Sequence, residues 1–171
     1  MLIPNVGTLS ALAADASEPL RQLAEAFWPG ALTVIVQANP SLDWDLGETG
    51  GTVALRIPGN QLTRELLQET GPLAVSSANK TGEPAAGTAA EALDALGESV
   101  AVYLDGGEAR GQASTIIDAT KLEADGTGTV AVLRAGAITA DAIREVLVDA
   151  TVVEGAAPEP ALPKPADPEA E

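Results

Sequence analysis

The sequence predicts an α/β fold, and three observations support this prediction. Segments with helical spacing of apolar residues alternate with short apolar runs along most of the chain. Several of these runs end in hydroxyl, amide or cationic side chains, as strands often do at the ligand-binding edge of an open sheet. The length of 171 residues suits a single domain over residues 1–150, followed by a disordered tail over 151–171 that is rich in Pro, Ala and acidic residues.

The N-terminal part of the chain predicts a strand, a helix and a second strand. Residues 1–6 form an apolar segment without a preceding turn, as though the chain begins inside a strand. A helix follows, with Ser17 as its N-cap and Pro29-Gly30 as its end. Residues 31–36 form a continuous apolar run, which is expected of a strand buried on both faces.

An alternating strand and a capped helix come next. In residues 52–57 every second side chain is apolar and suited to the core, so Arg56 points from the opposite face. Asn60 is a suitable N-cap for a helix that ends at Gly71. Residues 73–75 then predict a buried strand that leads into a cluster of small polar residues.

The C-terminal part of the domain predicts two more helices and three strands. Thr88 and Glu91 form a capping box for a helix that ends at Gly97, and Thr139 caps a final helix. The three strands are predicted from apolar runs at residues 100–104, 114–118 and 130–133.

The composition excludes several kinds of chemistry. The chain has no Cys and no His, so a disulfide, a thiolate nucleophile, a Ser-His pair and a thiolate or imidazole zinc site are all excluded. No signal peptide and no apolar run of membrane-spanning length is evident, which predicts a cytoplasmic location. The net charge of −16 disfavours broad binding to a nucleic-acid backbone, including tRNA.

Polar side chains at the predicted strand ends are the candidates for a binding site. They are Thr52, Arg56, Ser77, Asn79, Ser114, Thr115 and Arg134. If these strand ends converge, they form a pocket with donors for an anion and a rim of hydroxyl groups. Each residue alone also fits a structural role, such as a polar turn for Ser77 and Asn79 or a half-exposed strand for Arg56.

Six phrases of the sequence resemble, in order, the motifs of the YrdC-like family, the threonylcarbamoyl-AMP synthases. They are FWPGALTVIV (27–36), GTVALRIP (51–58), GPLAVSSANKTGEP (71–84), LDGG (104–107), STIID (114–118) and VLRAGAI (132–138). The resemblance implies a twisted open mixed sheet with flanking helices around a concave cleft.

The resemblance also implies a reaction. Members of the family condense L-threonine, bicarbonate and ATP into L-threonylcarbamoyladenylate and release pyrophosphate, for the threonylcarbamoyladenosine modification of tRNA. Magnesium is expected to arrive with ATP, and the tRNA-modifying threonylcarbamoyl transferase is an indirect partner. Carried onto this sequence, Arg56 and Ser114 are expected to bind L-threonine, and no catalytic residue or metal ligand is assigned. The residues expected to bind ATP are Thr52, Ser77, Asn79 and Arg134.

The sequence departs from the family pattern in two places. A nucleotide-binding hydroxyl expected shortly after Asn79 falls on Gly87, with Thr88 beside it. The opening TVYG and KxR segments, which supply threonine contacts and triphosphate-binding cations, have no counterpart, so the domain is expected to be N-terminally incomplete. Two alternatives to an active synthase therefore stay open, an RNA-binding YrdC-like module and a non-catalytic truncated paralogue.

Overall fold

The computed structural model describes residues 1–42, 44, 49–109 and 111–155. In chain order its elements are α1 (Gly7–Leu12), α2 (Glu18–Phe27), β1 (Leu32–Gln37), β2 (Thr52–Leu55), α3 (Gln61–Thr70), α4 (Ala89–Leu96), a 3₁₀ turn (Gly97–Ser99), β3 (Thr115–Leu122), β4 (Gly128–Arg134), α5 (Ala140–Val146) and β5 (Thr151–Glu154). The predicted α/β class is confirmed. Helix α1 was not predicted, because it is short and its N-cap, Val6, provides no side-chain hydrogen bond that a sequence pattern would reveal.

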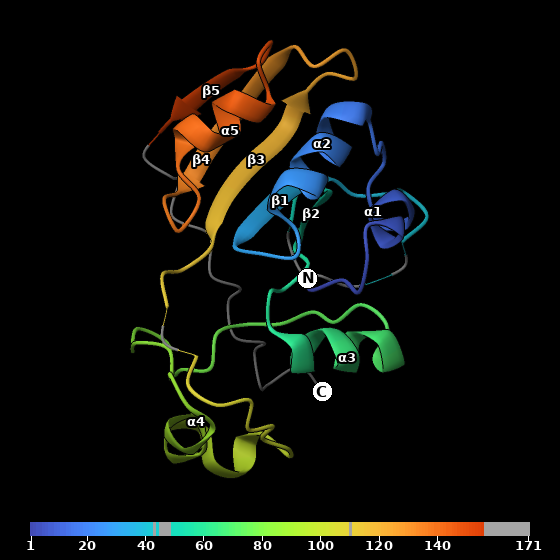
Figure 1. Ribbon diagram of the computed structural model, residues 1–171. Coiled ribbons are helices and arrows are strands. Elements are labelled where there is room, and N and C mark those ends of the chain that lie inside the picture. The colour runs from blue at the N-terminus through green and yellow to red at the C-terminus, as the bar shows by residue number, and fades with distance from the viewer. Residues whose placement is uncertain (43, 45–48, 110, 156–171) are drawn as a thin grey trace, which may run out of the picture.

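The strands form one mixed sheet in the order β2-β1-β3-β4-β5. The pairs β1–β3 and β4–β5 are parallel, while β1–β2 and β3–β4 are antiparallel. Helices α1, α2 and α5 lie against one face of this sheet, whereas α3 and α4 lie below it in the view of Figure 1. The expected open mixed sheet with flanking helices is therefore confirmed.

The hydrophobic core lies between the sheet and helices α1, α2 and α5. Its members include Leu9, Leu12, Leu20, Leu23, Leu32, Val34, Leu55, Ile117, Val130 and Ile143. Strand β1 alternates, because Leu32, Val34 and Val36 are buried while Thr33 and Ile35 are only partly covered. This alternation corrects the expectation that residues 31–36 are buried on both faces, and it leaves the second face of the sheet accessible to a ligand.

Helix caps follow the sequence closely. The predicted caps Asn60, Thr88 and Thr139 each accept a hydrogen bond from the backbone N–H of the third residue of their helix. Ser17 also precedes its helix as predicted, but its side chain makes no cap hydrogen bond. Within the described residues, no helix has the length and apolar character needed to cross a membrane.

Three predicted strands are wrong or much reduced. Residues 73–75 and 100–104 are irregular, and Val75 and Val102 are 54% and 69% exposed. In residues 1–6, Leu2 alone forms isolated bridges, to Arg56 and Leu73. A strand needs a neighbour for its backbone groups, and a short apolar run carries no information about whether that neighbour exists.

The C-terminal boundary of the domain also needs correction. Strand β5 lies within the predicted tail and pairs in parallel with β4, with Val152 buried against the core. Its β-branched residues Thr151, Val152 and Val153 favour a strand, which the Pro-rich composition further along obscured. Ordered structure therefore continues past residue 150, and the rest of the predicted tail, residues 156–171, lies outside the described residues.

Candidate functional site

The accessible face of the sheet carries most of the predicted site residues. Because side chains alternate along a strand, Thr52 and Arg56 share this face with Ala54, while Val53 and Leu55 point into the core. Thr33 lies on the same face of β1, which pairs with β2 on one side and β3 on the other.

Arg56 directly follows β2 and is held by the backbone around it. Its Nε donates a hydrogen bond to the Gly30 carbonyl at 2.7 Å, and its own backbone N–H donates to the Met1 carbonyl at 3.1 Å. Partial burial, and to a smaller extent the positive charge of Arg134, lower the pKa of the Arg56 guanidinium. The lowered pKa of Arg56 therefore reflects a partly desolvated guanidinium group that lies near the guanidinium group of Arg134.

Arg134 and Ser114 form the most closely connected pair in the site. Arg134 is the last residue of β4, and its Nε and Nη2 donate to the Ser114 carbonyl at 3.1 and 2.7 Å. The same Nη2 also donates to Ser114 Oγ at 2.8 Å. Ser114 is 6% exposed and immediately precedes β3, and the antiparallel β3–β4 ladder, in which Ile116 pairs with Arg134, brings the two residues together.

The turn that follows β4 packs closely against residues 113–115, which include Ser114. Thr115 is fully buried, and its Oγ1 donates to the Ile138 carbonyl at 2.6 Å and accepts from the Ile138 N–H at 3.0 Å. Gly136 passes so close that a Cβ atom there would lie 2.3 Å from the Ala113 carbonyl oxygen and 2.5 Å from the Ser114 carbonyl carbon. A side chain at position 136 would therefore displace the strand end that carries Ser114.

Arg56 and Arg134 make the site a local concentration of positive charge. In the part of the chain that the structure describes, neither forms an ion pair with a carboxylate, and both ion pairs found there belong to Arg144. Two neighbouring guanidinium groups that have no carboxylate partner among the described residues are suited to an anionic ligand, because Arg binds carboxylate and phosphate oxygens through two N–H groups at once.

Thr52 lies at the other end of this face, beside a small cavity. The cavity has a volume of about 230 Å³, and its lining includes Thr52, Ile35, Ala54 and Val75. Thr52 Oγ1 donates to the Thr49 carbonyl at 2.8 Å, so its hydroxyl oxygen keeps acceptor capacity for a ligand.

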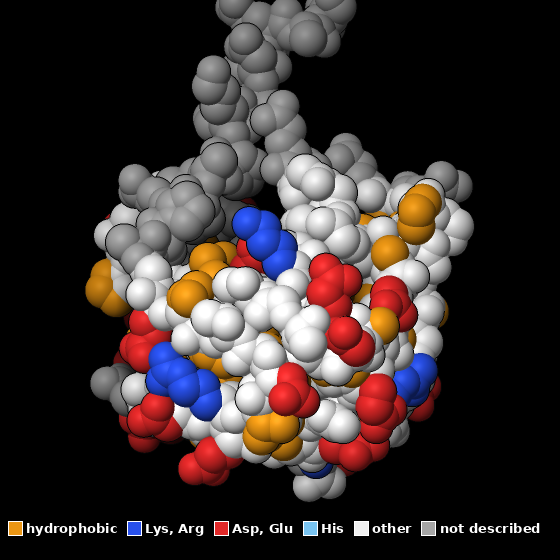
Figure 2. Space-filling view, turned by 90° about the horizontal axis from the view of Figure 1, so that it is seen from above, with side chains coloured by type: hydrophobic (Ala, Val, Ile, Leu, Met, Phe, Trp, Pro, Cys, Tyr) orange, Lys and Arg blue, Asp and Glu red, His pale blue; other side chains and the backbone are white. Residues whose placement is uncertain are grey.

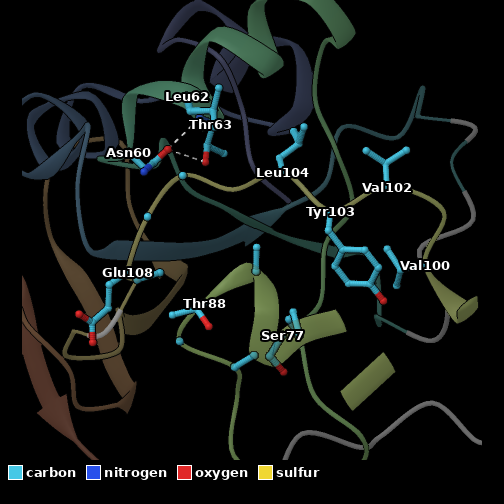
Figure 3. A pocket seen from close by; sticks show the side chains of 18 of the residues that line it. Asn60, Leu62, Thr63, Ser77, Thr88, Val100, Val102, Tyr103, Leu104 and Glu108 are labelled. Atoms are coloured by element: carbon cyan, nitrogen blue, oxygen red, sulfur yellow. Dashed lines mark hydrogen bonds between the residues drawn. The ribbon is translucent and has the colours of Figure 1, made fainter. Parts of the chain in front are cut away.

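Ser77 lines a larger cavity between α3 and α4, with a volume of about 610 Å³. Figure 3 shows Ser77 and Thr88 on the α4 side of this cavity, opposite Asn60, Leu62 and Thr63 of the α3 side. Its remaining wall is mainly apolar and comes from residues 100–109. A cavity of this size, with a mainly apolar wall and a few polar side chains, is suited to a small-molecule ligand.

Asn79 has an unsatisfied acceptor. Its Nδ2 donates to the Lys80 carbonyl at 2.9 Å, while its Oδ1 is buried and accepts no hydrogen bond from the described residues. A buried oxygen without a partner is costly, so a ligand donor at this point would gain a hydrogen bond without competing with the protein.

The predicted site residues therefore fall into separate places. Arg56, Ser114 and Arg134 form one cluster, Thr52 lines the small cavity, and Ser77 lines the large one. Sequence reasoning missed Thr33, whose Oγ1 lies 3.0 Å from Ser114 Oγ. A hydroxyl within an otherwise apolar strand was the available signal.

Acidic side chains do not form a metal site in the described residues, since no group of three or more Asp, Glu, His or Cys side chains is placed to hold a metal ion. They are instead spread over the surface, and on the face shown in Figure 2 they are scattered with few Lys or Arg side chains among them. That distribution offers no continuous basic surface on this face for a polyanion.

Comparison with known proteins identifies the relatives of this chain. The family model Sua5/yciO/yrdC, described as "Telomere recombination", matches residues 1–136. A protein of Mycobacterium tuberculosis H37Rv is 46% identical over 152 residues, which cover 88% of this chain and 67% of the relative. A threonylcarbamoyl-AMP synthase of Pyrococcus abyssi is 32% identical over 143 residues, covering 81% of this chain and 40% of the relative.

Solved structures of family members resemble the fold of this chain. The crystal structure of P. abyssi Sua5 complexed with L-threonine superimposes with a TM-score of 0.77 and 28% identity, covering 89% of this chain and 44% of that one. E. coli YciO shares the fold at a TM-score of 0.63 and 22% identity, with 81% and 66% coverage. The chain thus spans about two thirds of the mycobacterial relative and less than half of the archaeal one.

Proposed function

The chain belongs to the Sua5/YciO/YrdC family, and on that premise we propose that it acts as an L-threonylcarbamoyladenylate synthase. The reaction joins L-threonine, bicarbonate and ATP and releases pyrophosphate. Its product supplies the threonylcarbamoyl group of a modified tRNA adenosine, through a separate transferase. We propose that the reaction takes place in the cytoplasm.

The cluster of Arg56, Ser114 and Arg134 is the observation that carries this proposal. All three substrates of the reaction are anionic or zwitterionic, and the chain concentrates two guanidinium groups at one point despite a net charge of −16. Such a point attracts a carboxylate and a phosphate together, and it stabilises the negative charge that develops between them.

We assign the two halves of the cluster to different substrates. Arg56, with Ser114, binds the carboxylate and hydroxyl of L-threonine, because a partly buried guanidinium fixed through Nε keeps its outer N–H groups for a bidentate contact. Arg134 binds ATP, together with Thr52, Ser77 and Asn79. The contact between Arg134 and Ser114 supports this division, since substrates bound by these two residues would be adjacent.

The chemistry needs little from the protein beyond alignment. The amino group of L-threonine combines with bicarbonate, losing water, to give a carbamate. A carbamate oxygen then attacks the α-phosphorus of ATP, and the bond to pyrophosphate breaks. Positive charge from Arg134 near the attacked phosphate lowers the barrier, and juxtaposition of the reactants supplies much of the rest. Magnesium is carried by the ATP phosphates and neutralises part of their charge.

Pyrophosphate release is the direct test. The 171-residue chain is incubated with ATP, L-threonine and bicarbonate, and pyrophosphate and the adenylate are followed by an enzyme-coupled assay and mass spectrometry. Release that requires all three substrates supports the proposal. In parallel, L-threonine and ATP are each expected to raise the melting temperature, because both bind the folded state. If the chain shows no turnover and no rise in melting temperature with either ligand, the proposal is contradicted and a non-catalytic role remains.

An RNA-binding role is the less favoured alternative. The scattered acidic surface and the net charge of −16 both oppose contact with a phosphate backbone. Salt-dependent binding of tRNA at physiological ionic strength, measured by fluorescence anisotropy, would restore that alternative.

A further inference from the structure

The Ser114 hydroxyl is held by two residues from different strands. Arg134 Nη2 at the end of β4 lies 2.8 Å from Ser114 Oγ, and Thr33 Oγ1 on β1 lies 3.0 Å from the same atom. Ser114 itself is 94% buried, being 6% exposed, so its side chain has few other partners. Thr33 belongs neither to the residues that the sequence motifs assign to a substrate nor to the hydrophobic core.

The position of Thr33 is fixed by the parallel pairing of β1 with β3. Leu32 pairs with Thr115, and the Thr115 N–H donates to the Ala31 carbonyl at 2.9 Å. These contacts set the start of the two strands side by side, with Thr33 facing Ser114. Thr33 is also β-branched, and its side chain therefore has little rotational freedom within a strand. The distance between the two hydroxyl groups is thus a property of the sheet.

Either hydroxyl of the Thr33–Ser114 pair could be the donor, and hydrogen-bond capacity limits which arrangement leaves Ser114 able to donate to a substrate. A serine oxygen can donate one hydrogen bond and accept two. Arg134 is only a donor, so its contact uses one acceptor position of Ser114 Oγ. If Ser114 donated to Thr33, no proton would remain for a substrate. If Thr33 donates to Ser114, both acceptor positions are filled and the Ser114 proton is left to point into the site.

We propose that Thr33 is a positioning residue that donates its proton to Ser114 Oγ and thereby directs the Ser114 hydroxyl proton toward L-threonine. This inference rests on the proposed function, in which Ser114 binds that substrate. Thr33 acts through Ser114 and does not itself contact the substrate. Its effect is therefore specific to L-threonine and leaves ATP binding nearly unchanged.

Substitutions at Thr33 separate this role from packing. Thr33→Val keeps the shape and removes the hydroxyl, while Thr33→Ser keeps the hydroxyl and removes a methyl group. Thr129→Val is a matched control, because Thr129 is also a strand threonine but lies near the start of β4, whereas Arg134 is the last residue of that strand. Binding of L-threonine and of ATP to the full chain is measured by calorimetry for each variant, and again for Thr33→Val in a Ser114→Ala background.

We expect Thr33→Val to weaken L-threonine binding about tenfold, the effect of roughly one lost hydrogen bond, with less than a twofold effect on ATP. Thr33→Ser should keep most of the affinity, and Thr33→Val should add nothing once Ser114 is alanine. Unchanged L-threonine affinity in Thr33→Val, an equal loss of ATP affinity, or full additivity with Ser114→Ala would overturn the inference alone. A wild-type chain that binds no L-threonine would instead overturn the proposed function, and this inference with it.

Discussion

Arg134, at the end of β4, donates hydrogen bonds from Nη2 to two oxygens of Ser114, the carbonyl oxygen at 2.7 Å and Oγ at 2.8 Å. Arg134, which is assigned to ATP, is thus bonded directly to Ser114, which is assigned to L-threonine. Changes at Arg134 are therefore expected to affect both substrates.

Replacement of Arg134 by lysine tests this connection. Lysine keeps the charge but carries all its donors on one nitrogen, so it lacks the planar fork that reaches Ser114 with one edge and a phosphate with another. We expect Arg134→Lys to weaken both ATP and L-threonine by about tenfold each, from the loss of roughly 1.4 kcal/mol. Calorimetric titration with each ligand measures this. A loss confined to ATP would mean that the contact with Ser114 has no role in binding L-threonine.

Replacement of Arg56 should have a narrower effect. Arg56→Ala is expected to weaken L-threonine by roughly 2 kcal/mol, or about thirtyfold, because a charged hydrogen-bond donor is lost, and to change ATP much less. Arg64→Ala is the matched control, since Arg64 is a partly exposed residue of α3 that, like Arg56, donates to a backbone carbonyl, that of Gly59. Equal losses for both ligands in Arg56→Ala would contradict the assigned role.

Gly136 offers a test of the turn that fixes Ser114. In Gly136→Ala the new methyl group would meet backbone atoms of Ala113, Ser114 and Thr115 at 2.3 to 2.5 Å, so the turn must move. We expect destabilisation of about 2 kcal/mol, within the range for overpacked sites, measured by urea denaturation. Gly155→Ala, where a Cβ atom has nothing within 4 Å, is the control. Similar stability of the two variants would show that the close approach at position 136 is relaxed without cost.

Asp125 is expected to contribute to acid sensitivity. Hydrogen bonds from the side chain and backbone N–H of Thr127 lower the pKa of the Asp125 carboxyl. A lowered pKa means that the folded state binds fewer protons than the unfolded state, so this stabilisation is complete above about pH 4 and is lost as the pH falls through the folded-state pKa.

The matching experiment compares melting temperatures at pH 6 and pH 3. Asp125→Asn should show a smaller decrease between these two pH values than the wild type, because the variant has no proton to gain at this position. Asp94→Asn, on the exposed surface of α4, should retain the full decrease. Identical decreases in wild type and Asp125→Asn would contradict the contribution of Asp125.

The sequence predicted local structure better than it predicted pairing. The caps Asn60, Thr88 and Thr139 and the alternating strand β2 depend on neighbouring residues, and all were confirmed. Residues 73–75 and 100–104 had strand-like composition but form no strand in the described part of the chain, where only Leu73 makes a bridge, to Leu2. No local pattern reports that absence, since backbone pairing is a property of the whole sheet.

The site was predictable as a set of residues but not as an arrangement. Strand ends with hydroxyl, amide or cationic groups singled out Arg56, Ser114 and Arg134, which the structure brings together. The same reasoning grouped Ser77 with them, whereas Ser77 lines a separate cavity. Thr33 was missed because its importance depends on the register between β1 and β3, which single-strand patterns do not contain.

The neighbouring strands β1 and β3 have a consequence for how this chain matures on the ribosome. They pair directly, although β2, α3 and α4 lie between them in the sequence. Closing such a long loop is slow compared with forming local helices, and a nascent chain that ends before β4 has Arg56 but no Arg134. The two cations of the proposed anion site therefore meet only after nearly the whole domain has been synthesised, so a nascent chain that ends before β4 is expected to lack that site.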